Sequence, residues 1–461
     1  MSADTDPIKH IVVLMLENRS FDHMLGSMKS LYPTLDGINA MQPFVNLDKN
    51  GNRYVQSPHA SFKLPRGIDP KHEYANVCDQ LFKPAPNGGF VQDFLDHVKN
   101  IPAQAQEVMD YFDRQGSNRL NIMHALAERY LIADHWFSSV PGPTWPNRFF
   151  VHSGTANGYV SMGSPLRYWK RFPQMTVYDR LQQRGIPWRI YFGDVAQSFM
   201  LRRLRHRPLV QHFHFMSRFF EDAAGPAKDF PAYSFIEPKY FLPRRTDQHP
   251  PHDVGHGDEL IGRVYSALTK NEELWASTLL IVVYDEHGGF FDHAVPPPAV
   301  PPGGPVHEHF RFDRAGVRVP AILISPHVDQ GFDPTPFDHT SILKYATEKW
   351  GLDHLSDRVD AANSLAPLIR TTPVNMEPLA LAGPAFSHRM NALLDTPQEQ
   401  DGLDDLQRAL LEITEAMESE MDDPIPSHTL RAERVINDPD LAGELARDRV
   451  ARFLDLRRNE P

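Results

Sequence analysis

Residues 8–16 read IKHIVVLML and are followed at residues 17–23 by ENRSFDH. The first part is dense in apolar and β-branched side chains, which is typical of a strand buried on both faces of a parallel sheet. Four later segments have the same pattern, two of them more weakly: 189–192, 233–237, 279–284 and 319–325. We therefore expect residues 8–16 to form a core strand of a sheet.

Helical patterns lie between these strands, at residues 123–130, 257–269 and 340–350. Buried strands that alternate with helices favour an α/β fold in which helices cover both faces of a mainly parallel sheet. The ligands of such sheets bind beyond the carboxyl ends of the strands. Because Glu17 and Asp285 directly follow two of the predicted strands, we expect a site there.

Composition excludes several classes of protein. The chain has 461 residues and a net charge of −12, which disfavours binding to nucleic acid. Cys78 is the single cysteine, so no intrachain disulfide forms, which suits a reducing compartment. The sequence has no apolar run of about 18 residues, and residues 1–7 lack the pattern of a signal peptide. We expect a cytoplasmic or peripheral membrane location, with secretion without a cleaved signal left open.

The sequence changes in character after about residue 355. Five apolar residues then follow one another at helical spacing: Leu403, Leu406, Leu410, Ile413 and Met417. Residues 430–461 are polar and prone to form helices. These features predict a main domain at residues 1–355 and a mostly helical extension at residues 356–461. We expect the extension to pack on that domain or on a partner, where it could form a dimer.

Two motifs bring oxygen atoms to the predicted strand ends. Glu17 and Asn18 supply a carboxylate and an amide, although a helix start capped by Asn18 or Ser20 would explain the same residues. Asp285 and Glu286 supply two adjacent carboxylates and enter a glycine turn, in the segment YDEHGG. Buried carboxylates are costly unless they are paired or bind a metal ion, so this second motif favours a metal site.

A third motif, PGPTWPNR at residues 141–148, holds Thr144 in a loop that three prolines make rigid. A hydroxyl that precedes P-x-R can act as a metal-bound nucleophile, and the spacing is similar to the C-x-P-x-R segment of sulfatases. Threonine cannot be converted into the formylglycine of those enzymes. The alternative is a proline-rich turn in which Arg148 forms a structural salt bridge.

These motifs combine into one predicted centre with oxygen ligands only: Glu17, Asn18, Thr144, Asp285 and Glu286. Such a set suits one hard divalent cation, for example Ca²⁺, Mg²⁺ or Mn²⁺. The ion would lower the pKa of the Thr144 hydroxyl and make it a nucleophile. His72, His214 and His249 could bind an anionic substrate or protonate a leaving oxygen, while ordinary surface loops would also explain them.

Four segments, in this order along the chain, resemble the phosphoesterase family: IVVLMLENRSFDHMLG, SVPGPTWPNRFFVHSGT, HPPHDVGHGDEL and YDEHGGFFDHAVPPP. This family includes bacterial phospholipases C, an acid phosphatase and plant non-specific phospholipases C. The segments resemble the plant type most, and the similarity covers roughly residues 8–350.

The resemblance implies an alkaline-phosphatase-like α/β core and a phosphoenzyme mechanism, in which Thr144 attacks phosphorus while it is bound to one metal ion. It matches the remaining metal-ligand positions to Glu17, Asn18, Asp285 and Glu286. It matches three catalytic histidines to His249, His72 and His214. Arg148 and His287 are expected to have supporting roles.

We therefore expect a metal-dependent phosphoesterase, and first of all a non-specific phospholipase C. Such an enzyme would cleave phosphatidylcholine to diacylglycerol and a phosphorylated headgroup through a phosphothreonine. The alternative is a phosphomonoesterase of broad specificity on the same core, whereas the complete set of nucleophile and ligands disfavours a non-catalytic lipid-binding protein. Residues 201–207 (LRRLRHR) and the following HFHFM are basic and aromatic. They could contact a lipid surface or form an ordinary helix with a solvated basic face.

Overall fold

The computed structural model describes residues 5–65, 67–98, 102–241, 244–381, 403–421 and 439–459. Its centre is an eight-stranded sheet with the strand order β11-β4-β10-β9-β1-β8-β6-β7. The strands of this sheet are β1 (His10–Leu16), β4 (Leu131–Ala133), β6 (Trp188–Phe192), β7 (Phe213–Phe215), β8 (Tyr233–Glu237), β9 (Thr278–Tyr284), β10 (Ala321–Ile324) and β11 (Gly331–Asp333). Two small sheets pair β2 (Val45–Leu47) with β3 (Arg53–Val55) and β5 (Trp136–Phe137) with β12 (Phe337–Asp338).

The five predicted strands are present, and every residue of β1 and β9 is buried. β1 runs parallel to both β8 and β9, whereas β10 runs antiparallel to β9 and to β4. A parallel return normally needs a crossover helix, and the described chain between β9 and β10 contains none, which accounts for the reversed direction of β10. The sequence did not indicate β4, β7 and β11, each of three residues.

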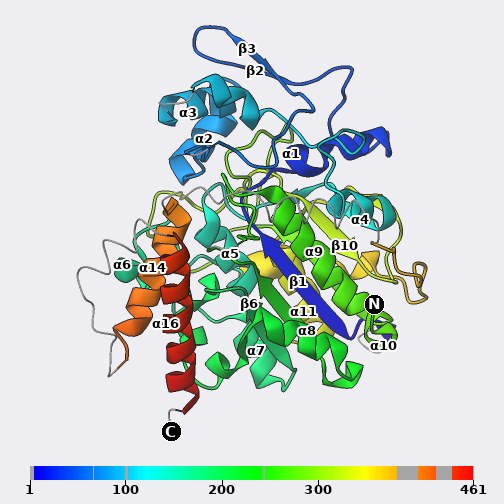
Figure 1. Ribbon diagram of the computed structural model, residues 1–461, viewed down its shortest axis with the longest axis vertical. Helices are drawn as coiled ribbons and strands as arrows, with labels where there is room; N and C mark the ends of the chain where they lie inside the picture. The colour runs from blue at the N-terminus through cyan, green and yellow to red at the C-terminus, as the bar shows by residue number, and fades with distance from the viewer. Residues whose placement is uncertain are drawn as a thin grey trace.

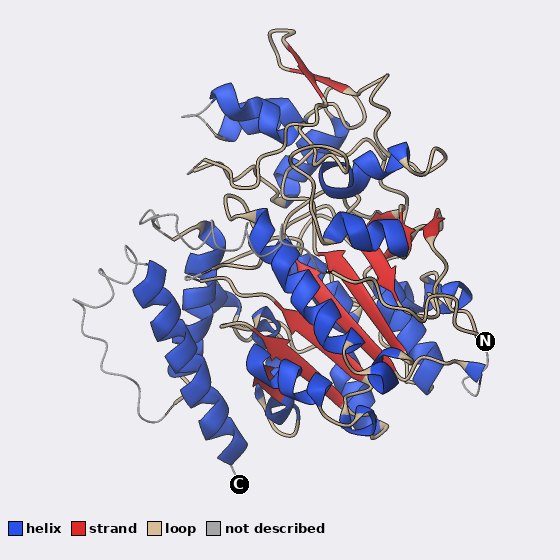
Figure 2. Ribbon diagram, turned by 45° about the vertical axis from the view of Figure 1, so that its right-hand side comes forward, coloured by secondary structure: helices blue, strands red, loops and turns tan. Residues whose placement is uncertain are grey.

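Helices lie in front of and behind the sheet (Figure 2). One group of neighbouring helices comprises α4, α8 and α9, and a second comprises α5, α7 and α11. The α-helices are α1 (Phe21–Leu25), α2 (Tyr74–Phe82), α3 (Phe90–His97), α4 (Met123–Arg129), α5 (Thr144–Ser153), α6 (Pro165–Tyr168), α7 (Val177–Gln183), α8 (Met216–Ala224), α9 (Val254–Thr269), α10 (Glu272–Trp275), α11 (Thr340–Trp350), α12 (Asp357–Ala361), α14 (Asp405–Glu418) and α16 (Pro439–Asn459). The predicted helices correspond to α4, α9 and α11, and the expected α/β class with a mainly parallel sheet is confirmed.

Short 3₁₀ helices complete the chain: η2 (Gly26–Ser30), η3 (Pro102–Val108), η4 (Gln197–Met200), η5 (Arg202–Arg205), η6 (Leu209–His212), η7 (Ala227–Asp229) and η8 (Ala366–Leu368). No helix in the described ranges is both long and apolar enough to cross a membrane.

The pairing of β1 with β9 sets the position of the site. Leu16 lies opposite Tyr284 in this parallel pair, so the next residues, Glu17 and Asp285, leave the sheet side by side. The arrowhead of β1 points toward the part of the molecule that contains α1, α2, α3 and the β2–β3 hairpin (Figure 1). The carboxyl ends of the central strands therefore lie beneath these elements.

Helices α14 and α16 lie side by side at the edge of the molecule (Figure 1). The five residues of the predicted apolar seam are all buried, and α14 packs against α6, η4 and α16 of the same chain. This seam is therefore not a free surface for dimer formation. Residues 382–402 and 422–438 of the predicted extension lie outside the described residues.

The basic and aromatic stretch that begins at Leu201 does not form one continuous α-helix. It folds into η5, η6 and the edge strand β7. Leu201 and Leu204 are buried, and the guanidinium of Arg205 lies 3.6 Å from the centre of the Trp169 ring. Phe453 of α16 contacts Phe199 next to this stretch. Leucine and phenylalanine side chains of the stretch thus pack inward, while Arg202 and Arg203 are exposed and Phe215 and Met216 are half-buried. The solvated basic face is therefore present on a 3₁₀ turn, and contact of this stretch with a lipid surface stays a prediction.

Candidate active site

Two loops interlock at the ends of β1 and β9. Asn18 adopts a left-handed conformation with φ of 58°, and its backbone N–H donates to Asp285 Oδ1 at 3.0 Å. Gly288 also has a positive φ, of 62°, and a Cβ added there would lie 2.2 Å from the carbonyl oxygen of Asn18. Glycine is thus required at this position, because the backbones of the two loops touch.

Thr144 is the first residue of α5 and follows Pro143, the N-cap. Asn147 ties the preceding loop together, since its Oδ1 accepts the Val140 N–H and its Nδ2 donates to the Gly142 carbonyl, both at 2.9 Å. The Thr144 hydroxyl is buried and lies 3.4 Å from both Glu17 Oε2 and Asn18 Oδ1. Three of the predicted ligand oxygens therefore converge at the amino end of a helix, where anions are stabilised.

Arg148 lies one helical turn after Thr144 and joins both strand ends. It donates to Glu17 Oε1 at 2.6 Å and to Asp285 Oδ2 at 3.2 Å. Gln197 Nε2 also donates to Glu17 Oε1, at 2.7 Å. Burial raises the pKa of Glu17 well above its usual value although Arg148 opposes the shift. One oxygen of Glu17 is thus anchored, and the other faces Thr144.

The two carboxylate oxygens of Glu286 also differ in their surroundings, as those of Glu17 do. Its Oε2 accepts the Gly288 N–H at 2.8 Å, whereas its Oε1 is buried without a hydrogen-bond partner and lies 3.9 Å from His72 Nε2. Burial raises the pKa of Glu286 to about 8, which His72 opposes and Asp285 reinforces. A buried oxygen with no donor is costly when charged, and a cation would remove that cost.

Two of the predicted histidines border these oxygens. His72 Nδ1 donates to the Pro70 carbonyl at 3.0 Å, and its Nε2 accepts from Asn18 Nδ2 at 3.3 Å, which turns Asn18 Oδ1 toward Thr144. Burial disfavours the charged imidazole of His72, but Glu286, Asp69 and Glu73 together outweigh this effect and raise the pKa. The ring of His249 is buried, and its centre is 5.9 Å from that of His72.

The other two histidines differ in their positions. His287 lies beside the cluster, since its Nδ1 is 3.3 Å from Glu286 Oε2 and its Nε2 pairs with Gln80 Oε1 at 2.7 Å, while burial lowers its pKa to about 3. His214 lies in the edge strand β7 opposite Tyr191, three strands from β1, and its ring contact is with that tyrosine. The structure does not bring His214 to the cluster, because Phe213 and Phe215 alternate with it in a strand that packs against the core.

Three residues of the cluster were not indicated by the sequence. Gln197 binds Glu17, the imidazole of His339 contacts the Asp285 carbonyl at 2.7 Å, and the Asp247 carbonyl accepts the Glu17 N–H at 2.9 Å. His339 lies in the segment FDHTSI, which belongs to the region of family resemblance. Gln197 lies in none of the motifs that carry the resemblance. It is brought to the site by the packing of η4, which the local sequence does not indicate.

The donor set fits a hard cation. Glu17 Oε2, Asn18 Oδ1 and Thr144 Oγ1 converge, and Glu286 Oε1 has no protein partner. Carboxylate, amide and hydroxyl oxygens are the ligands that Ca²⁺, Mg²⁺ and Mn²⁺ prefer. A second group of acidic side chains, Asp22 and Asp292 with His293, encloses the guanidinium of Arg318 and is an ion-pair network.

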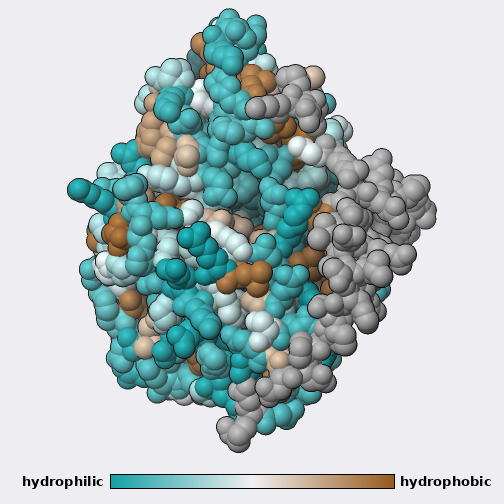
Figure 3. Space-filling view, turned by 90° about the vertical axis from the view of Figure 1, so that its left-hand side faces the viewer, coloured by the Kyte–Doolittle hydropathy of each residue, from teal (hydrophilic) through white to brown (hydrophobic). Residues whose placement is uncertain are grey.

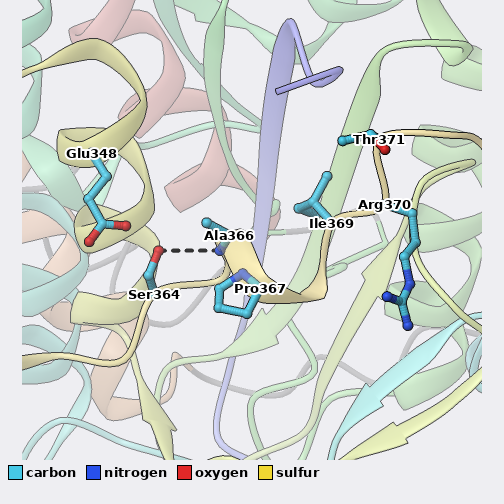
Figure 4. Close-up of a pocket in the computed structure, with 7 residues that line it drawn as sticks. All are labelled: Glu348, Ser364, Ala366, Pro367, Ile369, Arg370 and Thr371. Carbon is cyan, nitrogen blue, oxygen red and sulfur yellow. Dashed lines mark hydrogen bonds between the residues drawn. The ribbon is translucent and has the colours of Figure 1, made fainter. Parts of the chain in front are cut away.

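A surface pocket lies apart from this cluster (Figure 4). Glu348, Ser364 and Arg370 are its polar lining residues besides Thr371, and the Ser364 hydroxyl accepts the Ala366 N–H at 3.2 Å. Arg370 is exposed and forms an ion pair with Asp329. None of the residues predicted to act in catalysis lines this pocket, so it adds nothing to the candidate site.

Comparison with known proteins extends the resemblance. The sequence profile of the phosphoesterase family matches residues 8–353. Non-specific phospholipase C3 of Arabidopsis thaliana is 34% identical over 441 residues, which cover 89% of this chain and 82% of that protein. Non-specific phospholipase C1 of the same plant is 37% identical over 359 residues, or 73% of this chain and 66% of that protein. Non-hemolytic phospholipase C of Pseudomonas aeruginosa is 28% identical over 395 residues, or 75% and 54%.

Among solved structures, a protein in the alkaline phosphatase superfamily from Vibrio parahaemolyticus has a TM-score of 0.33 at 12% identity, over 56% of this chain and 63% of that one. The lipoteichoic acid synthase from Listeria monocytogenes has a TM-score of 0.40 at 10% identity, over 78% and 76%. Likenesses this remote carry no conclusion about function.

Proposed function

This chain belongs to the phosphoesterase family, and we propose that it is a metal-dependent, non-specific phospholipase C that works through a phosphothreonine. Its membership makes it a hydrolase of phosphoric esters. The observation that carries the finer proposal is the position of Thr144 Oγ1, 3.4 Å from both Glu17 Oε2 and Asn18 Oδ1. The names of its plant and bacterial relatives support a phospholipid substrate.

The metal would be held by Glu17, Asn18, Thr144, Asp285 and Glu286. When bound, a divalent ion supplies positive charge that lowers the pKa of the threonine hydroxyl and neutralises phosphate oxygens. The orientation of the ligands comes from the chain itself, because Arg148 and Gln197 hold the outer oxygen of Glu17 and the Gly288 N–H holds that of Glu286.

The reaction would proceed in two steps. Thr144 Oγ1 releases its proton to solvent and attacks phosphorus, the bond from phosphorus to the diacylglycerol oxygen breaks, and His249 gives that oxygen a proton, which it regains from the attacking water in the second step. Water then attacks the phosphothreonine, which restores the hydroxyl and releases the phosphorylated headgroup. The N–H groups of the first turn of α5 and the His72 side chain would stabilise the charge on the phosphoryl oxygens.

A paired assay tests this proposal. Purified protein receives short-chain phosphatidylcholine in one arm and a simple phosphomonoester in the other, with added Mg²⁺, Mn²⁺ or Ca²⁺ and with a chelator. We expect phosphocholine release to exceed monoester cleavage, and both to stop with the chelator. Monoester cleavage alone would instead establish a phosphomonoesterase on the same core, and activity that no chelator lowers would contradict metal dependence.

Contact with a bilayer would use the β2–β3 hairpin. The face in Figure 3 is largely hydrophilic, with apolar side chains in small, separate patches. Near the hairpin, Met41 is 89% exposed, and Phe44 and Leu47 are also exposed. Phe44 stacks on His293 of the segment that follows β9, so the hairpin lies on the side of the molecule to which the carboxyl ends of the central strands point (Figure 1).

A further inference from the structure

Helix α14 contacts the HPPHD segment, which carries His249 and His252, through its N-cap residue, Asp404. Asp404 Oδ1 accepts the Gln407 N–H at 2.7 Å and thereby caps the helix. Asp404 Oδ2 lies 2.8 Å from His252 Nε2. One carboxylate therefore ends the C-terminal helix and also contacts a histidine of the HPPHD segment, more than 150 residues earlier in the chain.

His252 is held between two carboxylates. Its Nδ1 lies 2.8 and 2.9 Å from the two oxygens of Asp247, and its Nε2 faces Asp404. A carboxylate accepts hydrogen bonds, so both ring nitrogens donate and the imidazole is cationic. Burial disfavours that charge, but Asp247 and Asp404 outweigh both burial and Arg245 and raise the pKa.

This arrangement leads directly into the candidate site. The His252 N–H donates to the His249 carbonyl at 2.7 Å, and the centres of these two rings are 5.9 Å apart. The Asp247 carbonyl accepts the N–H of Glu17. The position of the His252 ring is therefore coupled to the segment that carries His249 and to the end of β1.

Helix α14 is fixed at further points around the site. Gln407 Nε2 donates to the Tyr240 carbonyl at 2.7 Å, and Leu403 and Leu406 are buried. Asp405, in contrast, is exposed, and its ion pair of 3.5 Å with Lys71 is of a kind that contributes little. The start of α14 is thus fixed next to the segment that carries His249 by Asp404, and next to Tyr240 by Gln407.

We propose that Asp404 is a positioning residue, which holds His252 and through it His249 in the orientation that the phosphoester reaction needs. This proposal rests on the function proposed above. It assigns to helix α14 the role of orienting a catalytic histidine. The carboxylate acts through His252 and does not touch the substrate.

Asp404→Asn, with Asp405→Asn as its matched control, tests the proposal. Asparagine is also a good N-cap, so the variant keeps the helix start and loses only the charged partner of His252. We expect Asp404→Asn to lower kcat by about tenfold or more, with the melting temperature close to that of the wild type. Asp405→Asn makes the same charge change one residue away and is expected to keep full kcat. Full kcat in Asp404→Asn would overturn the proposal.

A double-mutant cycle separates positioning from general support of the fold. If Asp404 acts through His252, Asp404→Asn in a His252→Gln background causes no further loss of kcat. Losses that multiply in the double variant would contradict the proposal even if each single variant were impaired.

Binding of inorganic phosphate in the presence of Mn²⁺, measured by calorimetry, separates this inference from the proposed function. We expect Asp404→Asn and His252→Gln to bind phosphate about fivefold or more weakly than wild type, with Asp405→Asn unchanged. Weakened binding in a protein that hydrolyses no ester would overturn the proposed function and keep the coupling. Unchanged binding would overturn the coupling.

Discussion

Glu17 has two carboxylate oxygens in different surroundings. Oε1 accepts hydrogen bonds from Arg148 and Gln197, whereas Oε2 faces the hydroxyl of Thr144. Since the buried carboxylate is held at one oxygen, the other has a fixed direction before any ligand binds. Such preorganisation is what a nucleophile needs, because small displacements of reacting atoms cost large factors in rate.

Thr144→Ala is expected to lower kcat on phosphatidylcholine by about a thousandfold or more while the protein stays folded, because the nucleophilic oxygen is lost. Thr144→Ser keeps a hydroxyl at the same place and is expected to retain part of the activity. Steady-state kinetics and circular dichroism check both variants. Near-normal turnover by the alanine variant would show that another group is the nucleophile.

Glu286→Gln is expected to weaken the binding of Mn²⁺ by about tenfold or more, because it replaces the unpaired oxygen ligand by a neutral group of the same shape. Calorimetric titration measures the affinity. The matched control is Glu73→Gln, a change of the same size beside His72 at a residue outside the donor set. Equal affinities for wild type and Glu286→Gln would remove Glu286 from the metal site.

At the scale of elements, the sequence predicted the long strands correctly because they are continuous apolar runs. β1 and β9 are long apolar runs, and their parallel pairing places the residues that follow them side by side. For this reason Glu17 and Asp285 could be predicted as neighbours. The three-residue strands β4, β7 and β11 are too short to give a period, and Gln197, Asp247 and Asp404 reach the site only through tertiary packing. His214 was a wrong candidate for the cluster because its pattern of aromatic neighbours describes an edge strand equally well.

The glycine turn after β9 gives a stability prediction. Gly288→Ala would place a methyl group against the Asn18 carbonyl, whereas Gly185 has a similar φ, of 66°, with nothing within 4 Å of an added Cβ. We expect Gly288→Ala to lower the free energy of unfolding by about 2 kcal/mol more than Gly185→Ala does. Urea denaturation measures both, and equal losses would mean that the two loops do not touch.

The β2–β3 hairpin gives a prediction about lipid surfaces. Leu47→Asp, a change at an exposed residue of β2, is expected to weaken binding to phosphatidylcholine vesicles by about threefold or more and to leave hydrolysis of soluble short-chain lipid unchanged. Val374→Asp is the control, because Val374 is also exposed and its N–H bonds to Pro326, which follows β10 at the opposite end of the sheet. Vesicle sedimentation measures binding, and equal effects of the two changes would exclude the hairpin as the contact.

At the scale of the whole molecule, a buried ion network joins segments that are distant in sequence. His293 contacts Asp22 at 2.8 Å and Asp36 at 2.9 Å, while Arg318 bonds to Asp22 and Asp292. The network fixes α1, the turn after β9 and the start of β10 relative to one another. It therefore supports the loops of the site without taking part in the chemistry.

This network predicts how stability depends on pH. Burial disfavours charged His293, but Asp22 and Asp36 outweigh it and raise the pKa to about 10. The stabilisation is complete below about pH 6.5, the ordinary pKa of histidine, and is lost as the pH rises toward 10. Between pH 7 and pH 9.5 the free energy of unfolding should fall more steeply for wild type than for His293→Gln, by about 1.4 kcal/mol per pH unit. Denaturant titrations at several pH values check this, and equal slopes would contradict it.

The central claim is that Thr144 becomes covalently bound to phosphorus. Mass spectrometry after acid quenching of the protein with short-chain phosphatidylcholine and Mn²⁺ tests it most directly. The account predicts a phosphocholine adduct on the peptide that contains Thr144, formed within one turnover and absent from Thr144→Ala. Turnover of phosphatidylcholine by wild type with no adduct on Thr144, together with full activity of Thr144→Ala, would contradict it.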